Sequence, residues 1–231
     1  MVLNNEVIEF AKENGCGIIG FADLTKMPYT ANLGFKYGIV YALAFSKEAM
    51  LENNENKPQR YWDEHAPMSK TLAKLKNYTA ELLMKKGYAT EANTPAADIE
   101  ERTLRAALSQ KAVATMAGIG WIGKNAMLVT KEAGSAIRLT TVLTNAPIDC
   151  GTPITTSKCP VECMACTKIC PGKAPSGNNW SVETDRDEFF NAHACYTAGR
   201  KRAKELLDIE ITCCGLCISA CPFTKKALGY K

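Results

Sequence analysis

The feature that most constrains this chain is a pair of closely spaced cysteine motifs. Nine of its eleven cysteines lie between Cys159 and Cys221. Each motif contains the pattern C-x2-C-x3-C-P, ending once at Cys170-Pro171 and once at Cys221-Pro222, an offset of 51 residues. The pattern is an internal duplication, and it predicts a region that binds metal through thiolates.

The repeated C-x2-C-x3-C-P pattern is typical of proteins that hold two 4Fe-4S clusters. Neighbouring thiolates in a short turn bind one cluster, while the cysteine before proline binds the other. This crossed arrangement predicts one cluster held by Cys159, Cys163, Cys166 and Cys221. The second cluster would be held by Cys170, Cys214, Cys217 and either Cys195 or Cys213. We favour Cys195, because the adjacent side chains of Cys213 and Cys214 rarely reach one cluster.

The cysteines could instead bind zinc or form disulfides. A pair of four-cysteine zinc sites is possible, since C-x2-C turns also suit tetrahedral zinc, but zinc does not require the repeated x3-C-P segment. A disulfide scaffold predicts dispersed cysteines in a small exported chain, whereas this N-terminus lacks a signal sequence. We expect Cys16 and Cys150 to be buried thiols with no ligand role.

Composition indicates a globular protein of the cytoplasm. The chain has 231 residues, 46% of them hydrophobic, and its longest apolar stretch, 38–45, is too short to cross a membrane. Its formal charge is +4. Two oxidised clusters, each carrying about −2 with its thiolates, would bring that charge near neutrality. We therefore do not expect a nucleic-acid or membrane partner.

The pattern of apolar residues predicts an α+β fold. Helices are expected over 3–13, from Met68 to a stop at Gly87, and from a capping box at Asp98 and Glu101 to Gly118. Strands are expected over 17–21, 38–45, 126–130 and 136–144. A segment rich in Pro, Gly, Thr and Ser over 145–158 suggests an α/β domain at 1–150 and a cysteine-rich domain at 151–231.

A glycine-rich loop lies at the end of the last expected helix. The run Gly118-Ile-Gly-Trp-Ile-Gly-Lys-Asn125 satisfies G-x-G-x-x-G and nearly satisfies the phosphate-loop pattern. Both patterns require a strand before the loop and a helix after it, and here the order is reversed. The loop is therefore either a helix stop with a tight turn or a close backbone approach to a large flat cofactor.

The glycine-tryptophan loop, the phrase from Gly134 to Pro147 and the paired cysteine motifs together resemble the epoxyqueuosine reductase-like iron-sulfur proteins, which are related to reductive dehalogenases. The resemblance covers nearly the whole chain. It implies a nitroreductase-like domain that binds cobalamin, followed by a ferredoxin-like module with two 4Fe-4S clusters; flavin is the less expected cofactor. It also implies that Cys195 is a cluster ligand. The implied cofactor contacts are Gly118, Gly120, Trp121, Gly123 and Lys124.

The chain also departs from that family. The stretch that carries the family's catalytic aspartate corresponds to Ala92-Asn-Thr-Pro95, with Ala92 at the aspartate position. The chain resembles a short form of the family, and we do not expect the helical repeats that usually follow the second motif. Epoxyqueuosine is therefore not the expected substrate. Tyr61 and His65 are candidates for the missing proton donor, although His65 could equally be a residue at a helix entry.

The sequence is compatible with two functions. One is an iron-sulfur oxidoreductase that passes electrons to cobalamin and reduces an unidentified small-molecule substrate. The other is a ferredoxin-like electron carrier or activator. Either requires a redox donor protein, such as a ferredoxin or flavodoxin. Arg200-Lys-Arg202 and Lys225-Lys226 could form its docking face or be ordinary solvated charges, and His193 is expected to tune or shield a cluster.

Overall fold

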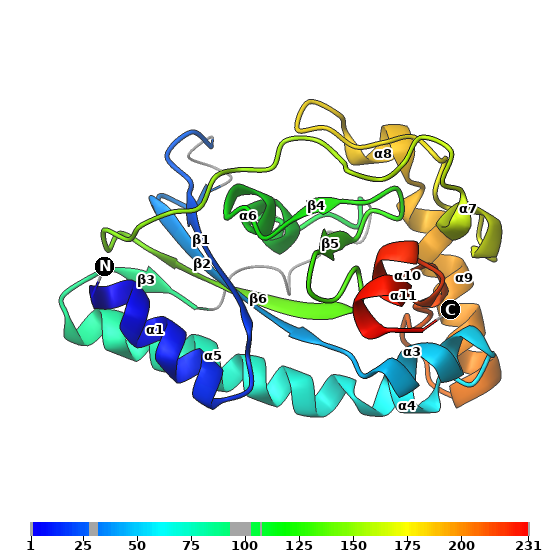
Figure 1. Cartoon of the computed structure of the whole chain (residues 1–231), viewed down its shortest axis with the longest axis horizontal. Coiled ribbons are helices and arrows are strands. Elements are labelled where there is room, and N and C mark those ends of the chain that lie inside the picture. Colours follow the sequence, from blue (N-terminus) through cyan, green and yellow to red (C-terminus); the bar gives the residue numbers. More distant parts are fainter. Residues whose placement is uncertain (1, 28–31, 93–102, 107, 231) are drawn as a thin grey trace. The chain divides into compact units, whose positions relative to one another are not determined.

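The computed structural model describes all residues except 1, 28–31, 93–102, 107 and 231 (Figure 1). The chain forms two compact units, and each combines segments that are distant in sequence. The first contains Met1–Leu43, Pro67–Gly120 and Arg138–Ile154; the second contains Ala44–Ala66, Trp121–Ile137 and Thr155–Lys231. Helices and strands occur together in the described chain, which confirms the mixed α+β prediction.

The first unit is built on a four-stranded sheet. Its strands, in spatial order, are β1 (Ile18–Asp23), β2 (Tyr37–Ala44), β6 (Ile137–Thr144) and β3 (Thr90–Glu91). β1 runs antiparallel to β2, with Ile18 opposite Ala42, and β3 runs antiparallel to β6. The three longer strands confirm the predictions at 17–21, 38–45 and 136–144. The two-residue β3 was not predicted.

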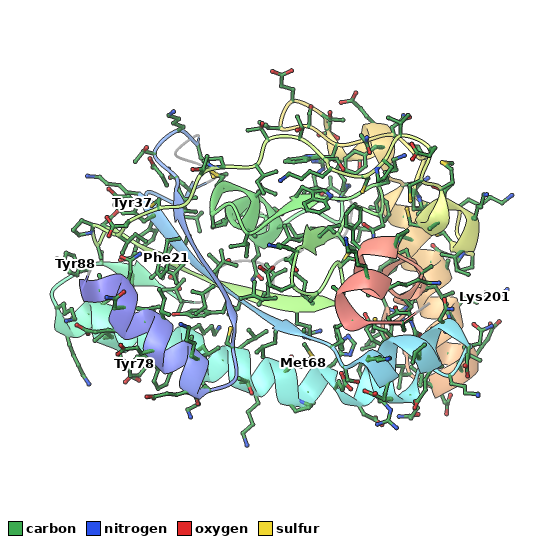
Figure 2. All side chains as sticks on the ribbon, viewed as in Figure 1. Phe21, Tyr37, Met68, Tyr78, Tyr88 and Lys201 are labelled. Atoms are coloured by element: carbon green, nitrogen blue, oxygen red, sulfur yellow. The ribbon has the colours of Figure 1, made fainter. Side chains whose placement is uncertain are left out.

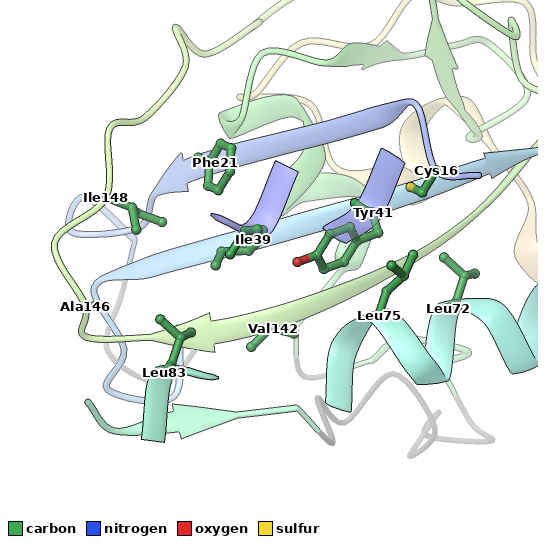
Figure 3. Close-up of a cluster of buried hydrophobic side chains, with 12 residues drawn as sticks. Cys16, Phe21, Ile39, Tyr41, Leu72, Leu75, Leu83, Val142, Ala146 and Ile148 are labelled. Carbon is green, nitrogen blue, oxygen red and sulfur yellow. The ribbon is translucent and has the colours of Figure 1, made fainter. Parts of the chain in front are cut away.

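Two helices, α1 (Val2–Glu13) and α5 (His65–Lys85), contribute to one buried apolar cluster with this sheet. Figure 3 shows Ile39 and Tyr41 from β2 facing Leu72 and Leu75 from α5. The ring of Tyr78, labelled on α5 in Figure 2, stacks on Phe10 of α1 with ring centroids 3.5 Å apart. Both helices agree with the predicted segments, and their apolar residues recur at the helical spacing that a buried face requires.

A shorter helix, α6 (Gln110–Met116), packs against the sheet through glycines. A Cβ on Gly20 would lie 2.8 Å from the Cβ of Ala117, and one on Gly38 would lie 2.6 Å from Val113. Because side chains alternate across a strand, Gly20 and Gly38 face away from their neighbours Phe21 and Ile39 in the apolar cluster. Any larger residue at these two positions would push α6 off the sheet.

The prediction of a long helix ending at Gly118 was wrong in its extent. α6 begins only after Ser109, whose hydroxyl accepts a hydrogen bond from the amide of Ala112. Leu104, expected in the middle of the helix, has φ of 53° and lies in a turn. The predicted capping box at Asp98 and Glu101 lies outside the described residues. Local capping by Ser109 thus sets the start of this helix.

The second unit consists of short helices and one small sheet. α3 (Lys47–Asn54) and α4 (Gln59–Asp63) precede the two-stranded sheet of β4 (Gly120–Ile122) and β5 (Leu128–Thr130). The cysteine-rich segment then forms α7 (Ala165–Ile169), α8 (Arg186–Phe189), α9 (Ala192–Leu207), α10 (Leu216–Ser219) and α11 (Pro222–Leu228). Nowhere in the described ranges is a helix both long and apolar enough to cross a membrane.

The apolar cluster of the first unit predicts different effects for two adjacent residues of α5. Leu83 is 0% exposed and Met84 is 55% exposed. Leu83→Ala should therefore lower the free energy of unfolding by about 2–5 kcal/mol, because it leaves a cavity, while Met84→Ala should change it by less than about 0.5 kcal/mol. Chemical unfolding followed by circular dichroism measures both, and equal effects would contradict this packing.

Candidate iron-sulfur site

The first predicted set of cysteines lies together in the second unit. Cys159 and Cys163 are in the loop before α7, Cys166 is in α7, and Cys221 precedes α11. The pKa of the Cys166 thiol is raised to about 11, first by burial and then by the neighbouring thiols. Those thiols are Cys221, Cys159 and Cys163. Because such influences weaken with distance, these three sulfurs lie in the neighbourhood of the Cys166 sulfur.

The second predicted set lies together in the same way. Burial raises the pKa of the Cys217 thiol well above its usual value, and four further thiols add to the rise. They are Cys195, Cys214, Cys166 and Cys170. Three of these complete the predicted second set, with Cys195 as its fourth member. The remaining one, Cys166, belongs to the first group, so the two groups are neighbours.

Close backbone packing around α9 explains how Cys195 comes to this place. A Cβ on Gly172, two residues after Cys170, would lie 2.5 Å from the carbonyl oxygen of Ala194. Further along the helix, a Cβ on Gly199 would lie 2.7 Å from the Thr212 side chain, beside Cys214. α9 therefore passes between the two segments that carry Cys170 and Cys214.

The duplication in sequence is also a duplication in local structure. The second shared cysteine of each motif lies in a short helix that ends before the third, Cys166 in α7 and Cys217 in α10. The cysteine before proline then has the same extended backbone in both, with φ and ψ of −71° and 115° at Cys170 and −64° and 125° at Cys221. Proline restricts the preceding residue to this region, so each Cys-Pro pair turns the chain at the end of its helix.

Hydrogen-bond donors surround the sulfurs of the two cysteines that precede proline. The amide of Ala174 donates to Cys170 Sγ at 3.4 Å. At Cys221, burial raises the thiol pKa, and this is opposed by hydrogen bonds from the backbone of Thr224 and Phe223 and from the Ser135 side chain. Such donors stabilise a thiolate relative to a thiol, which is the form that binds metal.

The described residues contain no group of three or more histidine, cysteine, aspartate or glutamate side chains that could hold a single metal ion. A 4Fe-4S cluster imposes a different geometry. Each of its irons takes one thiolate, so the four sulfurs stand further apart than the ligands of one zinc ion.

Part of the glycine-tryptophan loop lies against the first cysteine group. Lys124 is 2% exposed, and its Nζ donates to the carbonyl oxygens of Val161 and Cys163 at 2.7 and 3.1 Å. A Cβ on Gly123 would lie 2.9 Å from Asn125 Oδ1 and 3.7 Å from Cys159 Sγ. The strand predicted over 126–130 is confirmed as β5, but the segment predicted as a loop contains the three-residue strand β4, so the order is helix, β4, turn, β5.

The other predicted cofactor contacts, Gly118, Gly120 and Trp121, differ in what they pack against. Gly118 has φ of 74°, and a Cβ there would lie 2.4 Å from the carbonyl oxygen of Thr152, so the chain itself requires glycine. Gly120 is buried in β4. Trp121 is 6% exposed and packs edge-on against Phe223 with centroids 5.0 Å apart. Its indole Nε1 is buried and, among the described residues, has no hydrogen-bond partner.

The two candidate proton donors lie near the second cysteine motif. Tyr61 is 6% exposed, and its ring would be 2.8 Å from a Cβ on Gly215, the residue between Cys214 and α10. His65 Nδ1 lies 2.6 Å from the carbonyl oxygen of Tyr61, and the two rings meet edge to face at 4.7 Å. The structure thus brings Tyr61 and His65 together and packs Tyr61 against the turn after Cys214.

The expected basic docking face at 200–202 requires one correction. Lys201 is exposed, as its side chain in Figure 2 illustrates, but Arg202 is only 7% exposed. Cys195, Gly199 and Arg202 are spaced i, i+4 and i+7, so they share the inner face of α9. Helical periodicity could have identified Arg202 as buried, whereas its place in a run of basic residues suggested a surface. His193, two residues before Cys195, is exposed.

Comparison with known proteins gives a consistent result. No family model matches the chain. The epoxyqueuosine reductase of Listeria monocytogenes serovar 1/2a is 33% identical over 125 residues, which are 51% of this chain and 30% of that protein. The chain thus matches about a third of the length of this curated relative. An epoxyqueuosine reductase structure from Streptococcus thermophilus has a TM-score of 0.60 at 19% identity, covering 97% of this chain and 67% of that one.

Reductive dehalogenases have the same fold. A catabolic reductive dehalogenase has a TM-score of 0.67 at 14% identity, covering 94% of this chain and 31% of that one. A second dehalogenase structure, with a TM-score of 0.63, concerns B12-dependent dehalogenation. The chain therefore has the fold of epoxyqueuosine reductases and reductive dehalogenases, and the resemblance seen in the sequence is confirmed. One epoxyqueuosine reductase in this set contains a tRNA stem loop, which runs against our expectation of no nucleic-acid partner.

Close packing around α11 predicts unequal effects at two glycines of the second unit. Gly134 and Gly229 both have positive φ, but a Cβ on Gly134 would lie 2.3 Å from the backbone nitrogen of Thr224, whereas one on Gly229 meets nothing within 4 Å. Gly229→Ala should cost only the left-handed strain of about 1–2 kcal/mol. Gly134→Ala should cost distinctly more and displace the segment that carries Cys221. Thermal unfolding compares the two, and equal losses would rule out this contact.

Proposed function

We propose that this chain is an iron-sulfur oxidoreductase with two 4Fe-4S clusters. Cys159, Cys163, Cys166 and Cys221 would hold one cluster, and Cys170, Cys195, Cys214 and Cys217 the other. The observation that supports the proposal is that Cys166 and Cys217 each feel the electrostatic influence of the other thiols assigned to their cluster. Motif spacing assigned all of these thiols except Cys195, which was favoured over Cys213 because Cys213 adjoins Cys214 and because of the family resemblance. When bound, such clusters supply one-electron transfer.

The residues around each group fit a buried cluster. Cys166 and Cys221 are both 8% exposed, and Cys217 is strongly desolvated. Amide donors reach the sulfurs of Cys170 and Cys221. Both of those cysteines have extended backbone next to a helix end, Cys170 after α7 and Cys221 before α11. These residues would orient the thiolates, exclude water and stabilise their negative charge.

Proximity of the two groups supports a path for electrons. Cys166 of the first group acts electrostatically on Cys217 of the second. Clusters bound at the two groups would therefore lie near each other, and one-electron transfer between them is the chemistry that they would supply. A redox donor protein such as a ferredoxin or flavodoxin would supply the electrons one at a time.

A cobalamin that reduces a small-molecule substrate is the further part of the proposal. Its support is the shared fold, since one neighbour is associated with B12-dependent dehalogenation. In the loop, Gly118 is already required by a backbone contact within the chain and Gly123 packs closely against the Asn125 and Val129 side chains, so these glycines do not argue for a corrin. The buried and unpartnered Trp121 Nε1 is the feature that suits a polar ligand. Gly120 and Lys124 stay candidate contacts.

For the reaction with the substrate, only candidates for the proton donor are proposed. The aspartate of the reductases corresponds to Ala92, and Asn93 to Pro95 lie outside the described residues. Tyr61 and His65 stay candidates for the proton donor, although Tyr61 packs against the Cys214 turn. We therefore leave the substrate as an unidentified small molecule. Without a bound corrin or flavin, the same clusters would make the chain an electron carrier or activator.

Cluster ligation predicts different outcomes for Cys195→Ala and Cys213→Ala. Anaerobically purified wild-type chain should contain about eight iron and eight sulfide atoms. Cys195→Ala should lose up to about half of this iron and sulfide, because it removes one ligand of the second cluster. Cys213→Ala, a substitution of a buried thiol adjacent to a ligand, should retain nearly all of it.

Metal analysis by mass spectrometry and a sulfide assay give these values. Cys16→Ala serves as the control for loss of a buried thiol outside both groups. Full iron in Cys195→Ala with loss in Cys213→Ala would reverse the assignment of the eighth ligand. Zinc in place of iron and sulfide in the wild-type chain would overturn the clusters altogether.

Cobalamin binding can be tested separately. Adding hydroxocobalamin to the anaerobic wild-type chain should shift the visible spectrum of the corrin and yield a complex that survives gel filtration. Trp121→Phe, which retains an aromatic ring and removes the indole N–H, should weaken this binding, because the variant has no N–H group at this place to donate to the corrin. No spectral shift and no retained corrin would leave the clusters in place and favour the carrier function.

A further inference from the structure

Each cysteine group has one buried cation beside it. At the first group the cation is Lys124, whose Nζ donates to the carbonyl oxygens of Val161 and Cys163 at 2.7 and 3.1 Å. With only 2% of the residue exposed, this ammonium is removed from water. It is held on the loop that carries Cys159 and Cys163.

At the second group the cation is Arg202 of α9. One guanidinium nitrogen donates to the carbonyl oxygen of Cys214 at 3.0 Å, and the other lies 3.3 Å from the carbonyl oxygen of Asn53 and 3.4 Å from Asn56 Oδ1. The residue is 7% exposed, and its Nε is buried with no partner in the described structure. Arg202 thus ties the Cys214 segment to α3 while keeping a fixed positive charge beside it.

Neither cation is neutralised by an acidic side chain. In the part of the chain that the structure describes, every hydrogen bond of Lys124 and Arg202 goes to a carbonyl or amide oxygen. Carbonyl dipoles satisfy the N–H groups but supply no net charge. Burying an unneutralised cation costs several kcal/mol, so a compensating negative charge is expected close by. Each cation lies beside one of the two cysteine groups, whose thiolates would supply this negative charge.

We propose that Lys124 and Arg202 are the paired counter-cations of the two clusters, one for each, and that each raises the reduction potential of its own cluster. The inference rests on the proposed function. Reduction adds one electron and therefore one negative charge to a cluster with its four thiolates. A fixed buried cation stabilises the reduced form more than the oxidised form, since the attraction grows with the negative charge. Both are positioning residues that act through the cluster.

With one cation for each cluster, the reduction potentials of the two clusters would be set independently. Lys124 comes from the β4–β5 connection and Arg202 from α9, so neither belongs to the duplicated pattern itself. Each donates to the backbone of one ligand, Cys163 in the first motif and Cys214 in the second, and these two cysteines occupy equivalent positions in the repeat. Loss of one cation should therefore affect one cluster and spare the other.

The test is a redox titration of the full-length chain, purified without oxygen and followed by electron paramagnetic resonance. Arg202→Gln should lower one of the two midpoint potentials, and Lys124→Gln should lower the other. A tenfold weakening of reduction corresponds to about 59 mV for one electron, and we expect a shift of at least this size in each variant. Lys201→Gln removes a charge from the neighbouring exposed position, where solvent screens it, and should move neither potential.

Charge-retaining variants separate electrostatics from shape. Arg202→Lys and Lys124→Arg should keep iron content and both potentials close to those of the wild-type chain. If Arg202→Gln fails to assemble its cluster, Arg202→Lys should still assemble it, because the charge is kept.

Several results would overturn the inference. One is that Arg202→Gln and Lys124→Gln keep full iron and unchanged potentials. Another is that both variants move the same potential. A third is that Arg202→Lys and Arg202→Gln fail equally to assemble the cluster. A wild-type chain without iron and sulfide would instead refute the proposed function, so the two failures are distinguishable.

Discussion

Placing the two proposed sets of four cysteines is the constraint on which the second unit depends. The proposed ligands come from segments separated by up to 62 residues, from Cys159 to Cys221, and thiolates held near one another repel. Close backbone contacts hold these segments. Gly172 lies against Ala194, Gly199 against Thr212, and Gly134 against Thr224. Side chains at these glycines would separate the segments, so the region is built from short helices joined at close range.

Charge compensation completes that constraint. Two groups of thiolates would be unstable in a region of low polarity without nearby cations or donors. Lys124 and Arg202 supply buried positive charge, and the amides near Cys170 and Cys221 supply hydrogen bonds. This view changes the role of the glycine-tryptophan loop. Its Gly123-Lys124 end packs against the first cysteine group, and Trp121 is the member of the loop whose buried polar atom has no partner among the described residues.

Much of this arrangement followed from local patterns. Alternation and helical spacing identified β1, β2, β6, α1 and α5. The crossed C-x2-C-x3-C-P spacing predicted both cysteine sets apart from the eighth member, for which Cys195 was favoured over Cys213 because Cys213 adjoins Cys214 and because of the family resemblance. The start of α6 did not follow, because Ser109 caps a shorter helix than the apolar spacing suggested. Arg202 was placed on the surface because neighbouring charges outweighed its position on the inner face of α9. The contacts of Lys124 and Asn53 join residues far apart in sequence, which no local pattern reports. The division at residue 150 and the corrin contacts stay predictions.

The central claim is that the two cysteine groups hold cubane clusters, and Mössbauer spectroscopy of the chain enriched in 57Fe and purified without oxygen tests it most directly. The account predicts that nearly all the iron gives the quadrupole doublets of oxidised 4Fe-4S clusters, with about eight irons per chain. Reduction by dithionite should convert these doublets to those of the reduced clusters. Iron found only as isolated sites with four thiolate ligands, or a chain that carries zinc and no bound iron, would contradict it.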